Sequence, residues 1–477
     1  MDGLDFQEIN KKSLENEFTI GAEYYGKKYV EAVAQIKNQP STLTLGEMWE
    51  SATDGDHGSP DYQESGVMYL LSECVQEGYI EASKCRYITE QKNRELRRSC
   101  LHPGDIVVTK TGVYFGKSAV IPDSIPEANT IAHVGKITLK SQYNPYYVST
   151  FLNCKYGYYQ LRRRGIKATR PEIKLVEFPD IIVPLFSKDL YIAVETLVRK
   201  ANTLLDAANG AMNDSLQNLT SAMNIDFNNM MQKNTSVVGF IDSFKTTGRL
   251  DAEYYQPKYD AYLTVLKQFE TTSIPDEFYV LKNAGTNYAE GISDVGVIKT
   301  KQLANSGVNT DGVESYFTNE VCGQNKSTLI ANNDVIFASM GVGSLGKVSL
   351  FSYDGDKLFV TDSTLRIYRA KKTTRVLPEV LCIFLQSAIG QELIYRYVVG
   401  STGIINIYDD DIAKIPIPVL DTEIQKDIAT KVQESFVLRR QSKQLLEYAK
   451  QAVEMAIEQG ENAALAWLKL TVSDLEV

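Results

Sequence analysis

The chain has 477 residues, of which 43% are hydrophobic, 23% charged and 10% aromatic, so it is a globular protein of about two to four domains and not a disordered or collagen-like chain. Its formal net charge of −10 argues against a nucleic-acid binder that is basic over its whole surface. Because no apolar run is long enough to span a membrane and the acidic start lacks the apolar core of a signal peptide, we expect a soluble, cytoplasmic protein with no membrane partner.

The first third of the chain alternates short strands, glycine-rich turns and helices. Residues 105–109 and 136–140 are predicted as strands, and residues 151–164 as a helix. The proline-bearing apolar segment 181–184 closes this stretch as a further strand. The pattern is typical of an α+β module.

A long amphipathic helix is predicted next. Its apolar positions recur with the heptad spacing of a coiled-coil seam, at Leu190, Leu197, Leu204 and Ala211, with Val194, Ala201 and Ala208 between them. This seam needs a partner, because a helix of this length without a shared core would be poorly stabilised.

The second half of the chain repeats this order. Residues 365–368 are predicted as a strand, residues 377–398 as a helix, and the proline-bearing segment 415–418 leads into another long helix. The apolar stripe of that helix consists of Ile424, Ile428, Val432, Leu438, Leu445, Ala449, Ala452 and Ala456. Each long helix could pack on its own module, but we favour an antiparallel pair that joins the two modules.

An internal repeat at an offset of about 230 residues supports this organisation. The segment Ala22-Glu23-Tyr24-Tyr25 recurs as Ala252-Glu253-Tyr254-Tyr255, and further matches follow in the same order as far as residues 181–184 and 415–418. A unit this long indicates duplication of a whole domain and not a solenoid. We therefore predict two modules, 17–186 and 245–420, with a central spacer helix in 187–230 and a C-terminal spacer helix in 421–470, related by a pseudo-two-fold axis.

Catalytic and metal-binding templates are not supported by the sequence. The six cysteines form no CxxC pair and there are only three histidines, which argues against a zinc site, a redox pair or a Ser-His-Asp set. The spacing of Gly341, Gly343 and Gly346 fits GxGxxG, but no βαβ unit follows and the first module lacks the pattern. Residues 144–147 resemble the Asn-Pro-Pro-Tyr motif of adenine methyltransferases, but the second proline is missing. We expect no metal, no cofactor and no enzymatic activity in this chain.

Two basic clusters favour nucleic-acid binding. Residues 84–117 contain eight Lys or Arg against three Asp or Glu, and residues 155–174 contain seven against one, with three tyrosines interleaved. Such clusters neutralise phosphates, although a solvated basic helix would give the same count. Two glycine–lysine loops, 112–117 and 341–347, fit the same interpretation, although each could be a simple hairpin turn. The predicted DNA contacts are Lys110, Tyr114, Lys117, Arg162, Arg163, Arg164, Lys167 and Arg170 in the first module, and Ser339, Lys347, Arg396 and Ser401 in the second.

Three segments carry a resemblance to a known family. Residues 54–62 with 66–70 resemble the opening of a target-recognition domain, residues 104–117 resemble its central strand and loop, and residues 415–428 resemble its strand-to-helix junction. With the order of module, long helix, module and long helix, the chain resembles the specificity subunit of type I restriction-modification systems. The second module departs from the pattern at 290–293, where Asp-Gly-x-His has no clear counterpart.

The resemblance implies a fold, partners and a function. It implies two target-recognition domains joined by two long antiparallel coiled-coil-like helices, each domain reading half of a split double-stranded DNA target. It also implies two methyltransferase subunits docked on the helices, restriction subunits recruited to the complex, and S-adenosylmethionine bound by the methyltransferase. The docking residues would be Leu190, Leu197, Leu204, Ile424, Ile428, Leu438 and Leu445. The alternatives are an assembly scaffold that does not read DNA and an enzyme whose site is not recognisable in the sequence.

Overall fold

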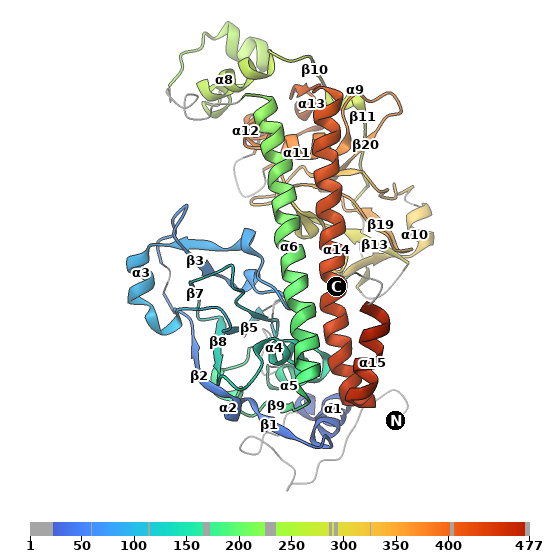
Figure 1. Ribbon diagram of the computed structural model, residues 1–477. Helices are drawn as coiled ribbons and strands as arrows, with labels where there is room; N and C mark the ends of the chain where they lie inside the picture. Colours follow the sequence, from blue (N-terminus) through green and yellow to red (C-terminus); the bar gives the residue numbers. More distant parts are fainter. Residues whose placement is uncertain are drawn as a thin grey trace. The chain divides into compact units, whose positions relative to one another are not determined.

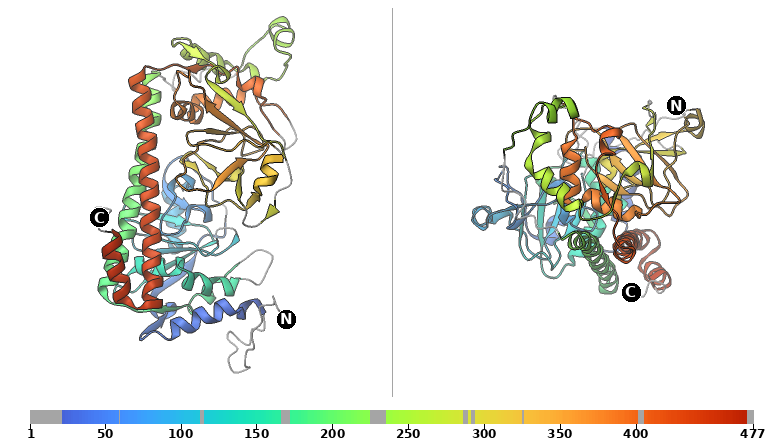
Figure 2. Two further views of the ribbon diagram at one scale, coloured as in Figure 1. Left: turned by 90° about the vertical axis from the view of Figure 1, so that its right-hand side faces the viewer. Right: turned by 90° about the horizontal axis from the view of Figure 1, so that it is seen from above.

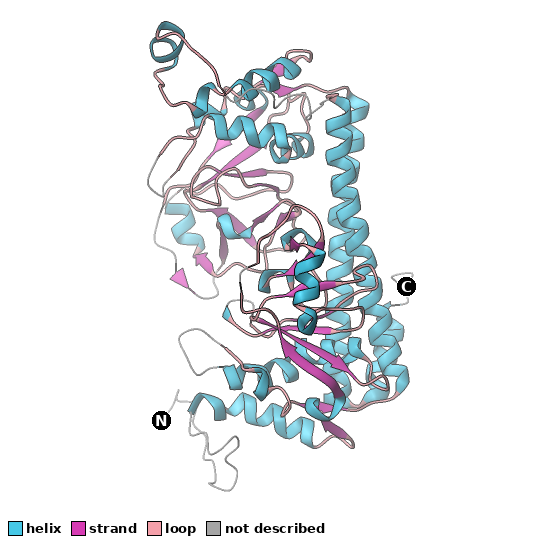
Figure 3. Ribbon diagram, turned by 90° about the vertical axis from the view of Figure 1, so that its left-hand side faces the viewer, coloured by secondary structure: helices cyan, strands magenta, loops and turns pink. Residues whose placement is uncertain are grey.

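The computed structural model describes residues 22–58, 60–112, 115–165, 172–224, 235–285, 289–290, 294–324, 326–400 and 405–472. The chain divides into two units (Figure 1). Unit 1 consists of Met1–Leu205 and Arg440–Val477, and unit 2 consists of Asp206–Arg439. Each unit contains one α+β module and one part of each long helix. In each unit the strands lie to one side of the helix pair (Figure 3).

The module of unit 1 is built on two sheets and a short strand pair. The first sheet is antiparallel, in the order β2 (Trp49–Asp54), β8 (Val134–Leu139), β5 (Ile106–Thr109) and β6 (Ser118–Val120). In the second sheet, β3 (Val67–Leu70) lies between the antiparallel β4 (Arg86–Ile88) and the parallel β7 (Ala128–Thr130). Strand β1 (Thr42–Thr44) pairs with the proline-bearing β9 (Ile182–Pro184). The strands predicted at 105–109, 136–140 and 181–184 are confirmed.

Five helices complete this module. They are α1 (Lys27–Lys37), α2 (Leu45–Met48), α3 (Glu90–Glu95), α4 (Pro145–Asn153) and α5 (Lys155–Gly165). Buried aromatic and aliphatic side chains of α4, including Tyr147 and Phe151, join Ile106 and Ile137 of the first sheet in one core. A second, smaller core lies against β3 and β7.

Unit 2 repeats this topology. One sheet has the order β11 (Phe278–Leu281), β20 (Leu365–Ala370), β17 (Val335–Ala338) and β18 (Val348–Leu350). In the other, β13 (Val295–Ile298) lies between the antiparallel β16 (Ser315–Phe317) and the parallel β19 (Leu358–Thr361), and β12 (Ala289–Glu290) adds to β16. Two short pairs are β10 (Thr271–Thr272) with β21 (Ile417–Pro418), and β14 (Leu303–Ala304) with β15 (Gly307–Val308).

The helices of unit 2 follow the same order. They are α8 (Pro257–Leu266), α9 (Ile274–Glu277), α10 (Asn319–Gln324), α11 (Pro378–Gln386), α12 (Ala388–Arg396) and α13 (Asp409–Ile412). The strand order and the parallel pair of the first module recur in the second, which adds β12 and the β14–β15 pair. The predicted duplication of an α+β domain is therefore confirmed in three dimensions.

Two long helices, α6 (Lys188–Ala222) and α14 (Thr422–Gln459), run through both units. In unit 1 the start of α6 packs against the end of α14, with Leu190, Val194 and Ala201 in the same core as Leu445 and Ala449. In unit 2 the end of α6 meets the start of α14, where the Ser435 hydroxyl donates to the carbonyl oxygen of Ala208 at 2.8 Å. The helices are therefore antiparallel, as predicted. None of the described helices is long and apolar enough to cross a membrane.

The segment 421–470, expected as one spacer helix, contains two helices. Gly460, at φ 91°, ends α14, and α15 (Glu461–Val472) folds back on it (Figure 2). The rings of Tyr448 and Trp467 meet edge to face at 5.6 Å, and Ala464 and Leu468 enter the core of unit 1. A glycine in the left-handed conformation is a common helix terminator, and it reverses the chain here.

The helices expected at 151–164 and 377–398 are each divided at a sharp corner. Cys154 and Ser387 adopt extended backbone conformations between α4 and α5 and between α11 and α12. Three residues later, Gly157 and Gly390 pass so close to the preceding helix that a Cβ atom would lie 2.1 Å and 2.0 Å from a backbone carbonyl oxygen. Hydrophobic periodicity alone does not reveal a corner at which both arms bury side chains.

The corner glycine gives a test of this packing. Gly390→Ala is expected to destabilise unit 2 by about 3 kcal/mol or more, because the new methyl group would meet backbone and not a flexible side chain. Gly210→Ala in α6 is the control, since nothing lies within 4 Å of its Cβ position, and it should stabilise the helix by about 1 kcal/mol. Urea unfolding followed by circular dichroism measures both, and equal effects would contradict the corner.

Candidate nucleic-acid interface

Lys110, which directly precedes the glycine–lysine loop of unit 1, is bound inside the module. The Lys110 ammonium lies 2.5 Å from Asp54 Oδ1, and its side chain is only 7% exposed. Lys117 donates to Gln76 Oε1 at 2.6 Å, and burial lowers the pKa of its ammonium group. Both predicted contacts therefore hold the loop to its own module. Tyr114, the third residue predicted here, lies outside the described residues.

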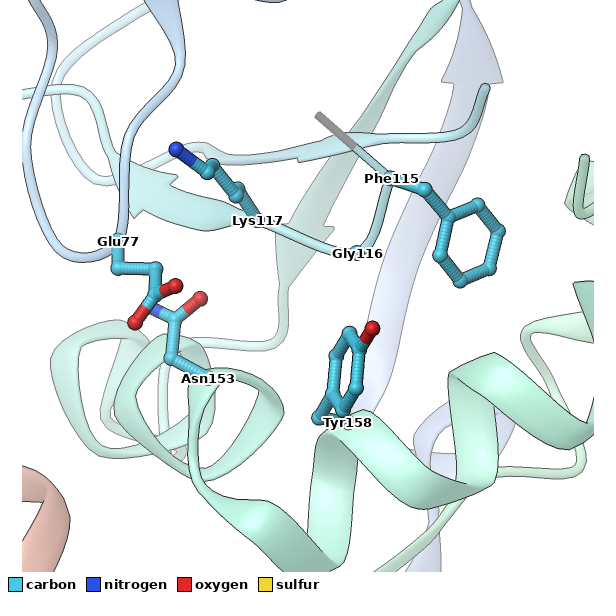
Figure 4. Close-up of a pocket in the computed structure, with 6 residues that line it drawn as sticks. All are labelled: Glu77, Phe115, Gly116, Lys117, Asn153 and Tyr158. Carbon is cyan, nitrogen blue, oxygen red and sulfur yellow. The ribbon is translucent and has the colours of Figure 1, made fainter. Parts of the chain in front are cut away.

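A cavity of about 190 Å³ adjoins this loop (Figure 4). Glu77 and Asn153 lie together on one side, and Phe115 and Tyr158 on the other. The Glu77 carboxylate accepts from Lys450 of α14 at 2.7 Å, and Asn153 is occupied by the backbone of Ser118. The lining thus offers an aromatic wall and polar groups that are already paired.

The corresponding loop of unit 2 exposes its lysine. Gly341, Gly343 and Gly346 all have positive φ values, which lets the chain turn tightly before Lys347. Lys347 is exposed to solvent. Ser339, in contrast, is buried, and both its amide and its hydroxyl donate to the carbonyl oxygen of Thr364.

The arginines of α5 have different environments. Arg164 is 2% exposed and donates to the carbonyl oxygens of Gln160 and Asp180. Arg163 is 4% exposed, with its guanidinium 4.7 Å from the centre of the Tyr24 ring. Arg162 is half-buried, 6.0 Å from the Phe115 ring. Of these three, only Arg162 presents part of its side chain to a ligand. Lys167 and Arg170 lie outside the described residues.

Arg396 of unit 2 is the duplicate of Arg163. Its guanidinium lies 4.8 Å from the centre of the Tyr254 ring and 5.5 Å from that of Tyr259. Each arginine lies in the last turn of the helix that contains the corner glycine, and it stacks on the first tyrosine of its own Ala-Glu-Tyr-Tyr segment. The duplication therefore preserves a cation–π contact that closes each module on itself. Ser401 lies outside the described residues.

The leucines and isoleucines predicted to dock a partner lie mostly between the helices. Leu190, Leu197, Ile428 and Leu445 are buried in the cores of the two units, and Leu204, Ile424 and Leu438 are half-buried. They form the seam and the contact with the modules. A partner on these helices would meet the outward side chains, such as Ile192, Leu216 and Val437, which are exposed.

Exposed positive charge gathers in the basic segment, which we define as residues 84–98 around α3. Arg97 and Arg98 follow α3 and are exposed, as are Lys84 and Arg86. Among the described residues these four side chains have no ion-pair or hydrogen-bond partner, whereas Lys92 and Arg94 pair with Glu95 and Glu90 of the same helix. The residue count for 84–117 contained this signal, but the predicted contacts were placed on the loop that follows.

Cys100 has polar neighbours, but its environment does not favour nucleophilic chemistry. The Cys100 thiol donates to Glu127 Oε1 at 3.0 Å, and His102 Nε2 lies 3.7 Å from the sulfur. Burial, together with the bond to Glu127, raises the pKa of Cys100 to about 11, so the thiolate is scarce at neutral pH. In the part of the chain that the structure describes, no group of His, Cys, Asp or Glu residues could hold a metal ion.

The fold thus defines a protein of two duplicated α+β modules joined through a pair of antiparallel helices. Residues 269–447, which span most of the second module and the first part of α14, match the family model of the type I restriction modification DNA specificity domain. The predicted resemblance to type I specificity subunits is confirmed by this match, which covers part of the second half of the chain. The search of curated proteins gave no match.

Solved structures of the same class resemble the chain at low identity. The type I restriction-modification S subunit from M. genitalium is 10% identical, with 90% of this chain and 96% of that chain covered and a TM-score of 0.33. The HsdS subunit from Thermoanaerobacter tengcongensis is 11% identical, with 88% and 97% covered and a TM-score of 0.27.

The stacking of Arg396 on two tyrosines predicts a structural role. Arg396→Met keeps an unbranched apolar stem but removes the charge, and it should cost about 1–3 kcal/mol of unfolding free energy. Lys347→Met in the same unit is the control, and since Lys347 is exposed it should change stability by less than about 0.5 kcal/mol. If both variants lose the same unfolding free energy in urea, the stacking of Arg396 has no structural role.

Proposed function

We propose that this chain is the sequence-specific DNA-binding specificity subunit of a type I restriction-modification complex. The observation that carries the proposal is the match of residues 269–447 to a DNA specificity domain, combined with a first module that has the same strand order. On this proposal, one chain holds two modules that read DNA. Each module would read one half of a split target, and the chain itself would carry out no chemistry.

The DNA contacts of the first module are proposed at the basic segment 84–98, with Arg162 in addition. Exposed cations without internal acidic partners are free to neutralise phosphates. In the second module the exposed Lys347 is the proposed contact. The buried Lys110, Arg163, Arg164 and Ser339 are assigned to holding the modules together, because their polar groups already have partners within the module.

The partners follow from the proposed role. Two methyltransferase subunits would dock on the outward faces of α6 and α14 and would bind S-adenosylmethionine, and restriction subunits would join that complex. The helices would act as a ruler, because a seam of fixed length sets the gap between the two half-sites. With a rise of about 1.5 Å per residue, a helix the length of α6 spans roughly 50 Å, compared with about 34–36 Å for one turn of DNA.

An assembly scaffold that does not read DNA is the second candidate. The apolar segment 237–250 favours it, since Val237, Phe240, Ile241, Phe244 and Leu250 are all exposed there. Clustered exposed apolar side chains mark protein contacts. A scaffold would bind its partner proteins but would show no salt-dependent affinity for duplex DNA.

Charge reversal in the basic segment tests the DNA interface. Arg97→Glu with Arg98→Glu should weaken duplex binding for every sequence and reduce the slope of log affinity against log salt by about 2, since each lost phosphate contact accounts for about 0.9. Lys267→Glu, at an exposed lysine directly after α8, is the control and should leave the slope unchanged. Fluorescence anisotropy with the methyltransferase complex between 50 and 200 mM salt measures both. Unchanged affinity at low salt would exclude the two arginines from the interface.

The ruler is tested by sequencing methylated adenines in host DNA after co-expression with the methyltransferase subunit. We expect one split motif with a fixed gap. Inserting one heptad after Leu205 in α6 and one after Arg439 in α14 keeps the seam in register but lengthens each helix by about 10 Å, or about three base pairs. Methylation at the original gap should then be lost. A stable wild-type complex without any motif would favour the scaffold, and an unchanged gap would refute the ruler.

A further inference from the structure

Two buried polar atoms of the first module, whose residues interact electrostatically, have no hydrogen-bond partner among the described residues. They are Oδ2 of Asp56 and the hydroxyl of Tyr69, and neither has a partner among the described residues. Tyr69 is 0% exposed, and the nearby charge of Asp56 acts on its hydroxyl. Because an unpaired buried polar group costs folding free energy, a pair of them in one place indicates a site that is completed by something else.

The backbone holds Asp56 in a fixed position. Its amide donates to the carbonyl oxygen of Thr130 at 2.8 Å, and its carbonyl oxygen accepts from the amide of Ala132 at 2.7 Å. Gly55 lies so close to the same strand end that a Cβ atom would be 2.3 Å from two carbonyl oxygens. The carboxylate is therefore set in place before any ligand arrives, which is the arrangement that selective recognition requires.

The pair lies under one exposed ring, next to the basic segment. Tyr69 is in β3, and in the antiparallel register it stands opposite Arg86 of the basic segment. The Tyr62 ring lies 6.0 Å from the Tyr69 ring and is 46% exposed. Its neighbours Asp61 and Gln63 are exposed as well, so little packing opposes rotation of the Tyr62 side chain.

The two groups have complementary hydrogen-bonding roles. An ionised carboxylate only accepts hydrogen bonds. Burial, with the charge of Asp56 and the nearby Tyr62 adding to it, raises the pKa of Tyr69, so its hydroxyl keeps its proton and can donate. A ligand that fits must therefore offer a donor and an acceptor side by side. In the major groove, adenine offers the N6 amino group beside N7, whereas guanine offers only the acceptors N7 and O6.

We propose that Asp56 and Tyr69 read an adenine in the half-site bound by the first module, with Asp56 accepting from N6 and Tyr69 donating to N7 after the Tyr62 ring turns aside. The assignment rests on the proposed function, since it names one base contact of the DNA reader. It makes Asp56 a determinant of specificity, whereas the arginines of the basic segment supply affinity for any sequence.

The second module lacks this pair, so the proposed reading of an adenine is confined to one half-site. In the parallel sheets, Leu70 is the partner of Thr130 and Ile298 is the partner of Thr361, so the residue equivalent to Tyr69 is Val297. Valine has no hydroxyl to donate. Changes at Asp56 or Tyr69 should therefore leave the half-site read by the second module unchanged, which gives every experiment an internal control.

The test compares methylated motifs in host DNA for the complex formed by the full chain and its methyltransferase subunit. Asp56→Ala and Tyr69→Phe should relax the same adenine position in the same half-site, with at least a tenfold fall in preference over guanine, as expected for loss of a good base contact. Asp61→Ala is the matched control, because Asp61 is exposed in the same loop and has no partner among the described residues. It should leave the motif intact.

The outcomes separate this inference from the proposed function. A wild-type complex without a split motif would refute the function itself. A normal wild-type motif that persists in both variants would overturn the inference and would mean that the pair holds only a bound water. If Asp56→Ala abolishes methylation, the base preference of the folded complex is measured instead by its binding to a randomised duplex library. If the variant selects the wild-type base at every position, the inference is again overturned. If its preference is relaxed at one adenine position, the inference is supported.

Discussion

The antiparallel seam between α6 and α14 is the interaction on which the rest of the structure depends. Neither helix has an apolar surface that its own module could cover along its full length, and each unit needs one stretch of both helices to complete its core. Unit 1 therefore takes its last forty or so residues from the opposite end of the chain. The side-chain amide Nε2 of Gln39 donates to the carbonyl oxygen of Ile457 at 2.8 Å across a separation of 418 residues.

The completion of unit 1 by the end of the chain has a consequence for folding. Unit 2 is continuous in sequence, from Asp206 to Arg439, whereas unit 1 is interrupted by it. The first module can form its sheets early, but its helical layer is incomplete until Leu445, Ala449 and Ala452 arrive. Contacts so distant in sequence make the closure of unit 1 a late step. The seam thus makes the two modules interdependent even though each has its own sheets.

The sequence predicted the repeated plan well because that plan depends on periodicity and order. Heptad spacing identified the seam, and the proline-bearing strands at 181–184 and 415–418 marked the end of each module. The corners at Cys154 and Ser387 were not visible, since both arms of each corner bury side chains and the cause is a close backbone approach at a glycine. The reversal at Gly460 was missed because α15 continues the apolar stripe of α14.

The candidate interface was harder to predict because charge counts do not distinguish an arginine that faces solvent from one that is bound inside. Arg163 and Arg97 each belong to a basic cluster, yet one stacks on a buried tyrosine and the other is exposed. A comparison of the two copies of the module in the sequence would have distinguished these two arginines. A residue that recurs at the equivalent position of both modules, as Arg163 does in Arg396, serves what the modules share, which is their fold.

The same reasoning shows where specificity is to be sought. Two modules that read different half-sites must differ at the residues that read bases, and they must agree at the residues that hold the fold. The tyrosine segments, the corner glycines and the stacked arginines agree. The pair of Asp56 and Tyr69 does not recur, and it leaves buried polar atoms unpaired, which packing alone would not favour. A feature that costs stability and is confined to one copy is therefore better explained by recognition than by folding.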